Sequence, residues 1–204
     1  ICETAATWPA ELIVMGAHGE SGSVRFLFGS TTTKIGRIAP CPVLVTRPGH
    51  ERIAAAGALR RALVAVDYSR FSAPAAELAA RMLAPGGRLA LMHVWQSPGN
   101  LPMPFTGERR TTAAARLEQF ADELDLSGVD VEVRIDVGNP AVQLLAQAER
   151  MDADLIVVGA HGRAGLVEQV IGTVADRVLR HAAAPVLLVP ERAVQPARED
   201  RALH

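Results

Sequence analysis

"DLIVVGAHGRAGLVEQVIGT", residues 154–173, joins a run of apolar residues to a glycine-containing segment that ends in Gly-Thr. A similar stretch, "ELIVMGAHGESGSVRFLFGS", occupies residues 11–30. A shift of 143 residues aligns 11–46 with 154–189 without a gap, and 15 of the 36 positions are identical. Self-similarity of this kind indicates a duplicated structural unit. The chain is therefore expected to contain two related copies.

The second copy is predicted to alternate strands and helices. Apolar runs typical of buried strands cover residues 61–69, 86–95, 129–137, 154–159 and 185–190. Apolar residues at helical spacing cover residues 72–84, 110–125, 141–151 and 173–182. Five strands that alternate with four helices predict a parallel sheet covered on both faces, which is an α/β, doubly wound fold.

The repeat also predicts the domain organisation. Residues 60–190 are expected to form one complete domain, because all five strands fall within them. The first copy has only its last part, so residues 1–48 are expected to be the C-terminal fragment of a first domain. Residues 49–59 then form the linker, and residues 191–204 a polar tail.

Composition and charge limit the classes of partner. The 21 lysines and arginines balance 22 aspartates and glutamates, so no net field favours nucleic acid or an acidic membrane surface. The apolar runs are far too short to span a membrane. Two cysteines, Cys2 and Cys41, stand without histidines at metal-ligand spacing, which favours a reduced intracellular compartment. A cytoplasmic protein is expected.

The glycines of residues 159–173 suggest a phosphate site. Gly159 and Gly162 suit a tight turn in which the backbone approaches a ligand. Gly172-Thr173 stands where the next helix is expected to begin, and a helix N-terminus attracts anions. Asp67 would end a neighbouring strand at the same crevice, where it can accept hydrogen bonds from ribose hydroxyls. A purely steric role of the glycines fits the spacing as well, and the absence of a lysine excludes the Walker pattern.

Six segments in this order resemble the universal stress protein family: "VAVDYS" (64–69), "LMHV" (91–94), "VGNP" (137–140), "DLIVVGAHG" (154–162), "GT" (172–173) and "APVLLV" (184–189). The family's phosphate motif, G-x2-G-x9-G-[ST], is matched by Gly159, Gly162, Gly172 and Thr173. The resemblance covers 61–190 as a complete domain and 1–47 as the end of another, as in a truncated tandem member. It implies a five-stranded, flavodoxin-like (Rossmann-like) sheet of order 3-2-1-4-5.

The ATP-binding members of that family imply a set of ligand contacts in this chain. The implied contacts are Ala65, Val66 and Asp67 for adenine and ribose, Val94 for main-chain contacts to adenine, Val158 beside the ribose, and Thr173 and Val174 for phosphate. Gly16, Gly19, Gly29 and Ser30 repeat the phosphate motif in the first copy. The strand that carries the aspartate is absent there, so this second pocket is expected to be incomplete.

The resemblance implies an ATP-binding regulator of the stress response, with Mg²⁺ accompanying the nucleotide and no catalytic residue. A slow ATPase and a dimerisation scaffold that binds no nucleotide remain the alternatives. His18 and His161 are interpreted as solvent-facing, since no carboxylate or nucleophile stands near them in sequence.

The resemblance also implies how the two copies meet. Members of the family pair the edge of strand five with another such domain, in the same chain or in a homodimer. Residues 41–45 and 184–189 are therefore expected to lie antiparallel, which hides two exposed sheet edges at once.

Overall fold

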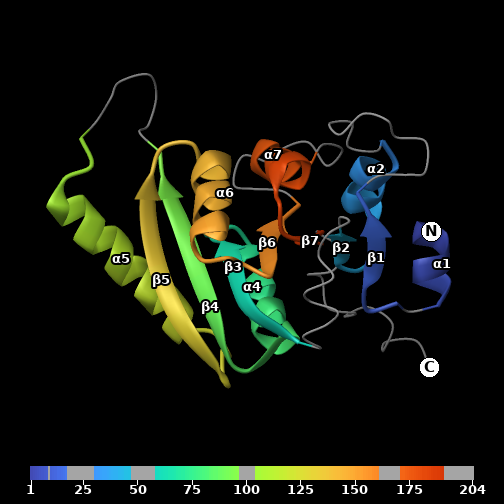
Figure 1. Cartoon of the computed structure of the whole chain (residues 1–204), viewed down its shortest axis with the longest axis horizontal. Coiled ribbons are helices and arrows are strands. Elements are labelled where there is room, and N and C mark those ends of the chain that lie inside the picture. Colours follow the sequence, from blue (N-terminus) through green and yellow to red (C-terminus); the bar gives the residue numbers. More distant parts are fainter. Residues whose placement is uncertain (9, 18–29, 47–57, 97–103, 161–170, 191–204) are drawn as a thin grey trace, which may run out of the picture.

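The computed structural model describes residues 1–8, 10–17, 30–46, 58–96, 104–160 and 171–190. Seven strands form one sheet in the order β1-β2-β7-β6-β3-β4-β5, seen across Figure 1. The elements in chain order are α1 (Cys2–Thr7), β1 (Ile13–Gly16), α2 (Ser30–Ile38), β2 (Val43–Thr46), β3 (Leu59–Ala65), α4 (Ser72–Met82), β4 (Leu83–Trp95), α5 (Gly107–Asp122), β5 (Val129–Val137), α6 (Pro140–Arg150), β6 (Leu155–Gly159), α7 (Thr173–His181) and β7 (Val186–Val189).

The doubly wound α/β fold expected from the sequence is confirmed. Strands β7, β6, β3, β4 and β5 are parallel neighbours in that order. With β3 as the first strand of the unit, this is the order 3-2-1-4-5 read from the opposite edge. One helix begins earlier than expected for a local reason. Helix α5 begins at Gly107 rather than at residue 110, because the Thr106 hydroxyl accepts a hydrogen bond from the Arg109 N–H and caps the helix.

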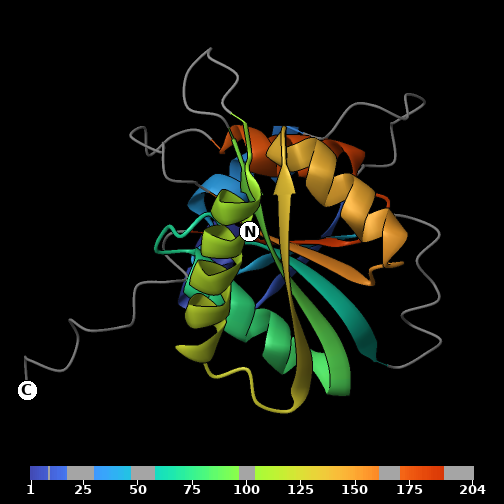
Figure 2. The same ribbon diagram turned by 90° about the vertical axis from the view of Figure 1, so that its left-hand side faces the viewer.

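Side chains of alternating strand residues form two apolar layers, one on each face of the sheet. Leu63, Met92 and Ile156 belong to the layer beneath α6 and α7. Val64 and Leu91 belong to the layer beneath α4 and α5. Figure 2 shows these two pairs of helices on opposite sides of the strands. Because both faces are covered, the strands consist of nearly continuous apolar residues.

Strands β2 and β7 join the two repeat copies within one sheet. They pair antiparallel, with Val43 opposite Leu188, Leu44 opposite Leu187 and Val45 opposite Val186. Leu44 and Leu187 are equivalent positions of the repeat, so the register has a local two-fold symmetry at this pair. The antiparallel pairing expected for residues 41–45 and 184–189 is confirmed.

Helix α2 approaches β7 closely at Gly36. A Cβ atom added to Gly36 would overlap Leu188 Cδ2 and come within 3.3 Å of Ile171 Cδ1. The equivalent position in the second copy holds Leu179, so the repeat alone does not predict this contact. The absence of a side chain at Gly36 lets α2 lie against the buried Leu188.

We expect Gly36→Leu to lower the free energy of unfolding by about 1–3 kcal/mol, because it forces four carbons into a filled interface. Urea denaturation followed by circular dichroism measures the change. Gly107→Leu is the matched control, since a Cβ at this helical glycine meets no atom within 4 Å. A Gly36→Leu variant as stable as the wild type would contradict the close approach of α2 to β7.

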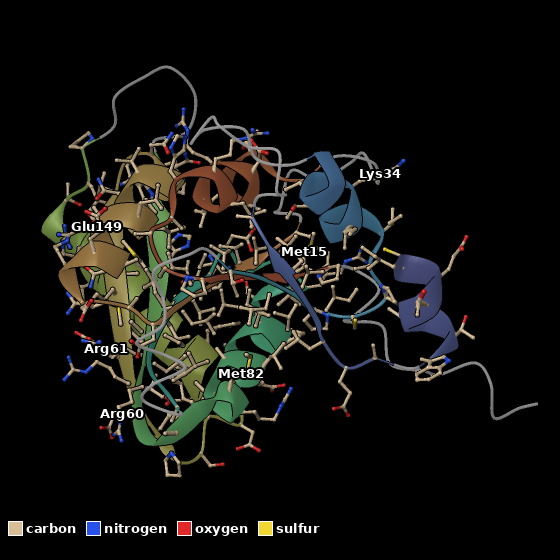
Figure 3. All side chains as sticks on the ribbon, turned by 45° about the vertical axis from the view of Figure 1, so that its right-hand side comes forward. Met15, Lys34, Arg60, Arg61, Met82 and Glu149 are labelled. Atoms are coloured by element: carbon tan, nitrogen blue, oxygen red, sulfur yellow. The ribbon has the colours of Figure 1, made fainter. Side chains whose placement is uncertain are left out.

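Strand β1 is the outer edge of the sheet, and it carries Met15 (Figure 3). It pairs with β2 on one side, and the described residues place no strand on its other side. Val14 on this strand is 60% exposed, and Trp8 at the end of α1 is 77% exposed. Apolar side chains therefore reach solvent at this end of the sheet. Within the described ranges, no helix has the length and apolar character needed to cross a membrane.

Candidate functional site

The order of the strands places a switch point at the carboxyl end of β3, where a crevice is expected. The chain passes from β3 to β4 on one side, whereas β6 lies on the other side. At such a switch point the connections on the two sides diverge, and ligands of open α/β sheets bind there. The pairing of β3 with β6 ends at Val64 and Val157, and β6 continues to Gly159 and β4 to Trp95.

Main-chain groups of β4 and β6 face this crevice from both sides. The Met92 carbonyl accepts a hydrogen bond from the Val66 N–H on the β3 side of β4. Main-chain direction alternates along a strand, so the N–H and C=O of Val94 point to the same side, past the end of β3. Ala160 donates to Val189 on the β7 side of β6, and the main chain of Gly159 therefore points toward β3.

Asp67 lies just after β3, between those two strands, and its carboxylate is held by its own loop. Its Oδ1 atom accepts a hydrogen bond from the Ser69 N–H at 2.9 Å and another from the Ser72 hydroxyl at 2.9 Å. The Asp67 N–H in turn donates to the Ser72 Oγ at 3.2 Å. Ser72 is the first residue of α4 and is 3% exposed. The sequence analysis identified Asp67 but missed both serines.

The main chain next to Asp67 is held by β4. The Nδ1 atom of His93 lies 2.8 Å from the Val66 carbonyl oxygen, and because a carbonyl only accepts, Nδ1 is the donor. Val66 is thus engaged through its N–H and its carbonyl. Because both main-chain groups of Val66 are already hydrogen-bonded, the expected contact of this buried residue with adenine or ribose is left to its side chain.

Tyr68, the residue directly after Asp67, has a strained backbone conformation. Its φ is 60°, a region that costs energy for a residue with a bulky side chain. Its ring packs against His93 and Phe120, with centroids 4.8 and 5.8 Å away, and the Arg116 guanidinium lies 4.0 Å above it. Burial raises the pKa of Tyr68, and the charge of Arg116 opposes this shift. Tertiary packing therefore holds the turn that follows Asp67.

Helix α7 begins beside the end of β6, at the expected phosphate motif. The Gly172 N–H donates to the Ala160 carbonyl at 2.8 Å, so the start of α7 is tied to the end of β6. Gly172 is the N-cap of α7, and no side chain caps this helix. Thr173 is exposed, Val174 is partly buried and Val158 is buried. The first N–H groups of α7 thus lie, like Asp67, at the carboxyl ends of the parallel strands.

Two of the motif glycines, Gly159 and Gly172, have backbone conformations that do not require glycine. Gly172 has φ −56°, which any residue can adopt. Gly159 ends strand β6, and the described glycines with positive φ are Gly86, Gly128 and Gly138. The backbone conformation of Gly159 therefore does not require a glycine. Space for a close approach, rather than backbone conformation, is the remaining reason for a glycine at 159 and 172.

Several residues of the expected motifs lie outside the described part of the chain, and two residues of the first copy lie within it. Gly162, His161, His18, Gly19 and Gly29 are outside the described residues. In the first copy, Gly16 ends β1 and Ser30 begins α2, at the positions equivalent to Gly159 and Thr173.

The ion-paired arginine of β3 lies at the far end of the strand from Asp67. Arg61 contacts Asp152 at 3.0 Å and Asp154 at 3.2 Å, at the start of β6, and Figure 3 shows it at the opposite end of the sheet from α7. It therefore plays no part in this crevice. Among the described residues, no three His, Cys, Asp or Glu side chains come together as a metal site.

A family model described as the universal stress protein family matches residues 1–47 and 58–190 of the chain. A universal stress protein of Mycolicibacterium smegmatis is 32% identical over 196 residues, which cover 92% of this chain and 64% of that protein. One from Mycobacterium tuberculosis is 28% identical over 196 residues, covering 88% of this chain and 61% of that protein. The chain thus spans just over three fifths of the length of these relatives.

Solved structures agree with the fold. The crystal structure of a universal stress protein from Archaeoglobus fulgidus aligns with a TM-score of 0.66 and 23% sequence identity. The alignment covers 93% of this chain and 63% of that one. At this level of identity, the likeness concerns the architecture alone.

Proposed function

The chain belongs to the universal stress protein family, and from this premise we propose that it binds an adenine nucleotide, ATP, as a regulator in the stress response. The proposed site is the crevice at the carboxyl ends of β3, β4 and β6. The observation that carries the proposal is the convergence there of the Asp67 carboxylate with main-chain groups of Val94 and Gly159. The proposed contacts are Ala65, Val66, Asp67, Val94, Val158, Gly159, Gly162, Gly172, Thr173 and Val174.

Each part of the crevice suits one part of the nucleotide. A carboxylate accepts hydrogen bonds from sugar hydroxyls, which is the role proposed for Asp67. Main-chain donors and acceptors at Val94 suit the polar edge of adenine. The N-terminus of α7, whose N-cap Gly172 makes no side-chain cap hydrogen bond among the described residues, carries a partial positive charge that suits the phosphates.

Magnesium is proposed to arrive with the phosphates rather than to occupy a protein cage. Mg²⁺ usually keeps several waters and binds through one or two carboxylates together with substrate phosphates. Asp67 places a carboxylate beside the end of β3, Asp176 in the first turn of α7 is paired with Arg180, and the described residues form no cluster of three ligands. The metal is therefore a companion of the nucleotide in this proposal.

Two alternatives remain as proposals. Slow ATP hydrolysis at the same site is the enzymatic one. The other is a scaffold in which the strand-five edge at β7 pairs with a second domain of this kind, in the chain or in a homodimer; in this structure β2 of the first copy occupies that edge. The edge-to-edge register of β2 and β7 favours such an assembly and is compatible with nucleotide binding in the same molecule.

Calorimetric titration with ATP, ADP and AMP, with and without Mg²⁺, tests the proposal. We expect saturable binding of ATP with one site per chain, since the first copy lacks a counterpart of Asp67 in the described residues. Analysis of the products after incubation distinguishes binding from hydrolysis. Absence of heat and of protection against thermal unfolding at millimolar nucleotide would leave the scaffold as the better explanation.

A further inference from the structure

The side chain of Ser72 is buried at the start of α4 and makes two hydrogen bonds to one residue, Asp67. Its hydroxyl donates to Asp67 Oδ1 at 2.9 Å and accepts from the Asp67 N–H at 3.2 Å. The reciprocal pair ties the carboxylate and the main chain of Asp67 to the same atom. Ser72 is 3% exposed, so this arrangement is shielded from water, which would otherwise compete for both bonds.

We infer that Ser72 is a positioning residue for the sugar of the bound nucleotide, acting through Asp67; this inference rests on the proposed function. A carboxylate selects a ligand by geometry only if its own rotation is restricted. Ser72 and the Ser69 N–H both donate to Oδ1, and these two bonds determine the plane of the carboxylate group. Specificity for a ribose that carries hydroxyls then depends on a serine that does not contact the ligand.

The position of Ser72 in its helix supports this assignment over an ordinary capping role. The N-cap residue of α4 is Phe71, and no side chain makes a cap hydrogen bond to this helix. Ser72 stands one residue further on and turns back to the loop after β3 rather than toward the N–H groups of its own helix. Its hydrogen bonds therefore serve the geometry of Asp67.

The test compares ATP with 2′,3′-dideoxy-ATP, which lacks the sugar hydroxyls. In the wild type, we expect ATP to bind at least about tenfold more tightly, the value of one or two hydrogen bonds to a charged group. Ser72→Ala should weaken ATP by about fivefold to tenfold and leave dideoxy-ATP nearly unchanged, so the ratio of the two dissociation constants falls toward one. Ser72→Thr keeps the hydroxyl and should retain most of the wild-type ratio.

The chain offers a matched control at a distant turn. The Ser127 hydroxyl donates to Asp125 Oδ1 at 2.8 Å, just before β5 and hence at the amino ends of the parallel strands. Ser127→Ala removes the same kind of bond and should change neither dissociation constant. Ser72→Cys, which preserves the size of the side chain with a weaker donor, replaces Ser72→Ala if that variant does not fold, and the same fall in the ratio is expected.

The outcomes separate the inference from the proposed function. A Ser72 variant that weakens ATP and dideoxy-ATP by the same factor would overturn the inference, because Ser72 would then act only on stability. A wild-type ratio of one would overturn it too, while ATP binding itself would stand. Failure of the wild type to bind either nucleotide would overturn the proposed function, and the inference with it.

Discussion

Gly172→Val is expected to weaken ATP binding by about 100-fold, or about 3 kcal/mol. Gly172 is the N-cap of α7, and its φ of −56° is open to any residue. The substitution therefore leaves the helix start intact, and the loss comes from a branched side chain in the space where the phosphates approach the N–H groups. Calorimetry measures the dissociation constant, and circular dichroism verifies that the variant is folded.

Two further variants support the interpretation of that result. Gly172→Ala adds a single carbon and should give an intermediate loss. Gly107→Val places the same side chain at the first turn of α5, where an added Cβ meets no atom within 4 Å, and should not alter ATP binding. Equal affinity of the wild type and Gly172→Val would exclude the start of α7 as the phosphate site.

Asp67→Ala is expected to weaken ATP, ADP and AMP by a similar factor, about 30-fold. The reason is that the proposed contact of Asp67 is to the sugar, which all three ligands share, and a hydrogen bond to a charged group contributes about 1.5–3 kcal/mol. Titration of the three nucleotides under one set of conditions measures the factors. A loss confined to ATP would instead indicate that Asp67 binds the metal ion that accompanies the phosphates.

The loss of affinity must be separated from a loss of stability. Asp67 Oδ1 accepts hydrogen bonds from the Ser69 N–H and the Ser72 hydroxyl, so its removal also affects the start of α4. Asp125→Ala is the matched control, because Asp125 Oδ1 accepts from the N–H and the hydroxyl of Ser127 in the same way. We expect this control to keep its full affinity for ATP.

Much of the fold was predictable because the signals are local. A buried parallel strand needs a continuous apolar run, and "DLIVVG" shows one at residues 154–159, where β6 runs from Leu155 to Gly159. Turns and caps are local as well. Asn139 caps α6 by accepting from the Val142 N–H, with Pro140 at the first helical position. The antiparallel pairing of β2 with β7 was predicted from the family resemblance, whose members pair the edge of strand five with another such domain.

The candidate site was predictable only in part. A motif of glycines and an aspartate indicates where phosphate and sugar are expected, and the structure brings Asp67, Gly159 and the start of α7 to one edge of the sheet. The motif alone leaves open whether these glycines serve backbone conformation or close approach of a ligand. Sequence shows that a side chain is absent at Gly159, whereas only the backbone shows that its φ is not positive.

By itself, the sequence determined the repeat and the alternation of strands and helices, since both follow from periodicity and chain order; the strand order and the expected site came from the resemblance to the family that its motifs carry. Only the tertiary structure decided what surrounds Asp67. Ser72 turns back to it from α4, and His93 reaches the adjacent carbonyl from β4, 27 residues away in sequence. A serine or histidine has no sequence pattern that specifies its partner, because hydrogen bonds depend on which atoms the packed sheet and helices bring within about 3 Å of each other.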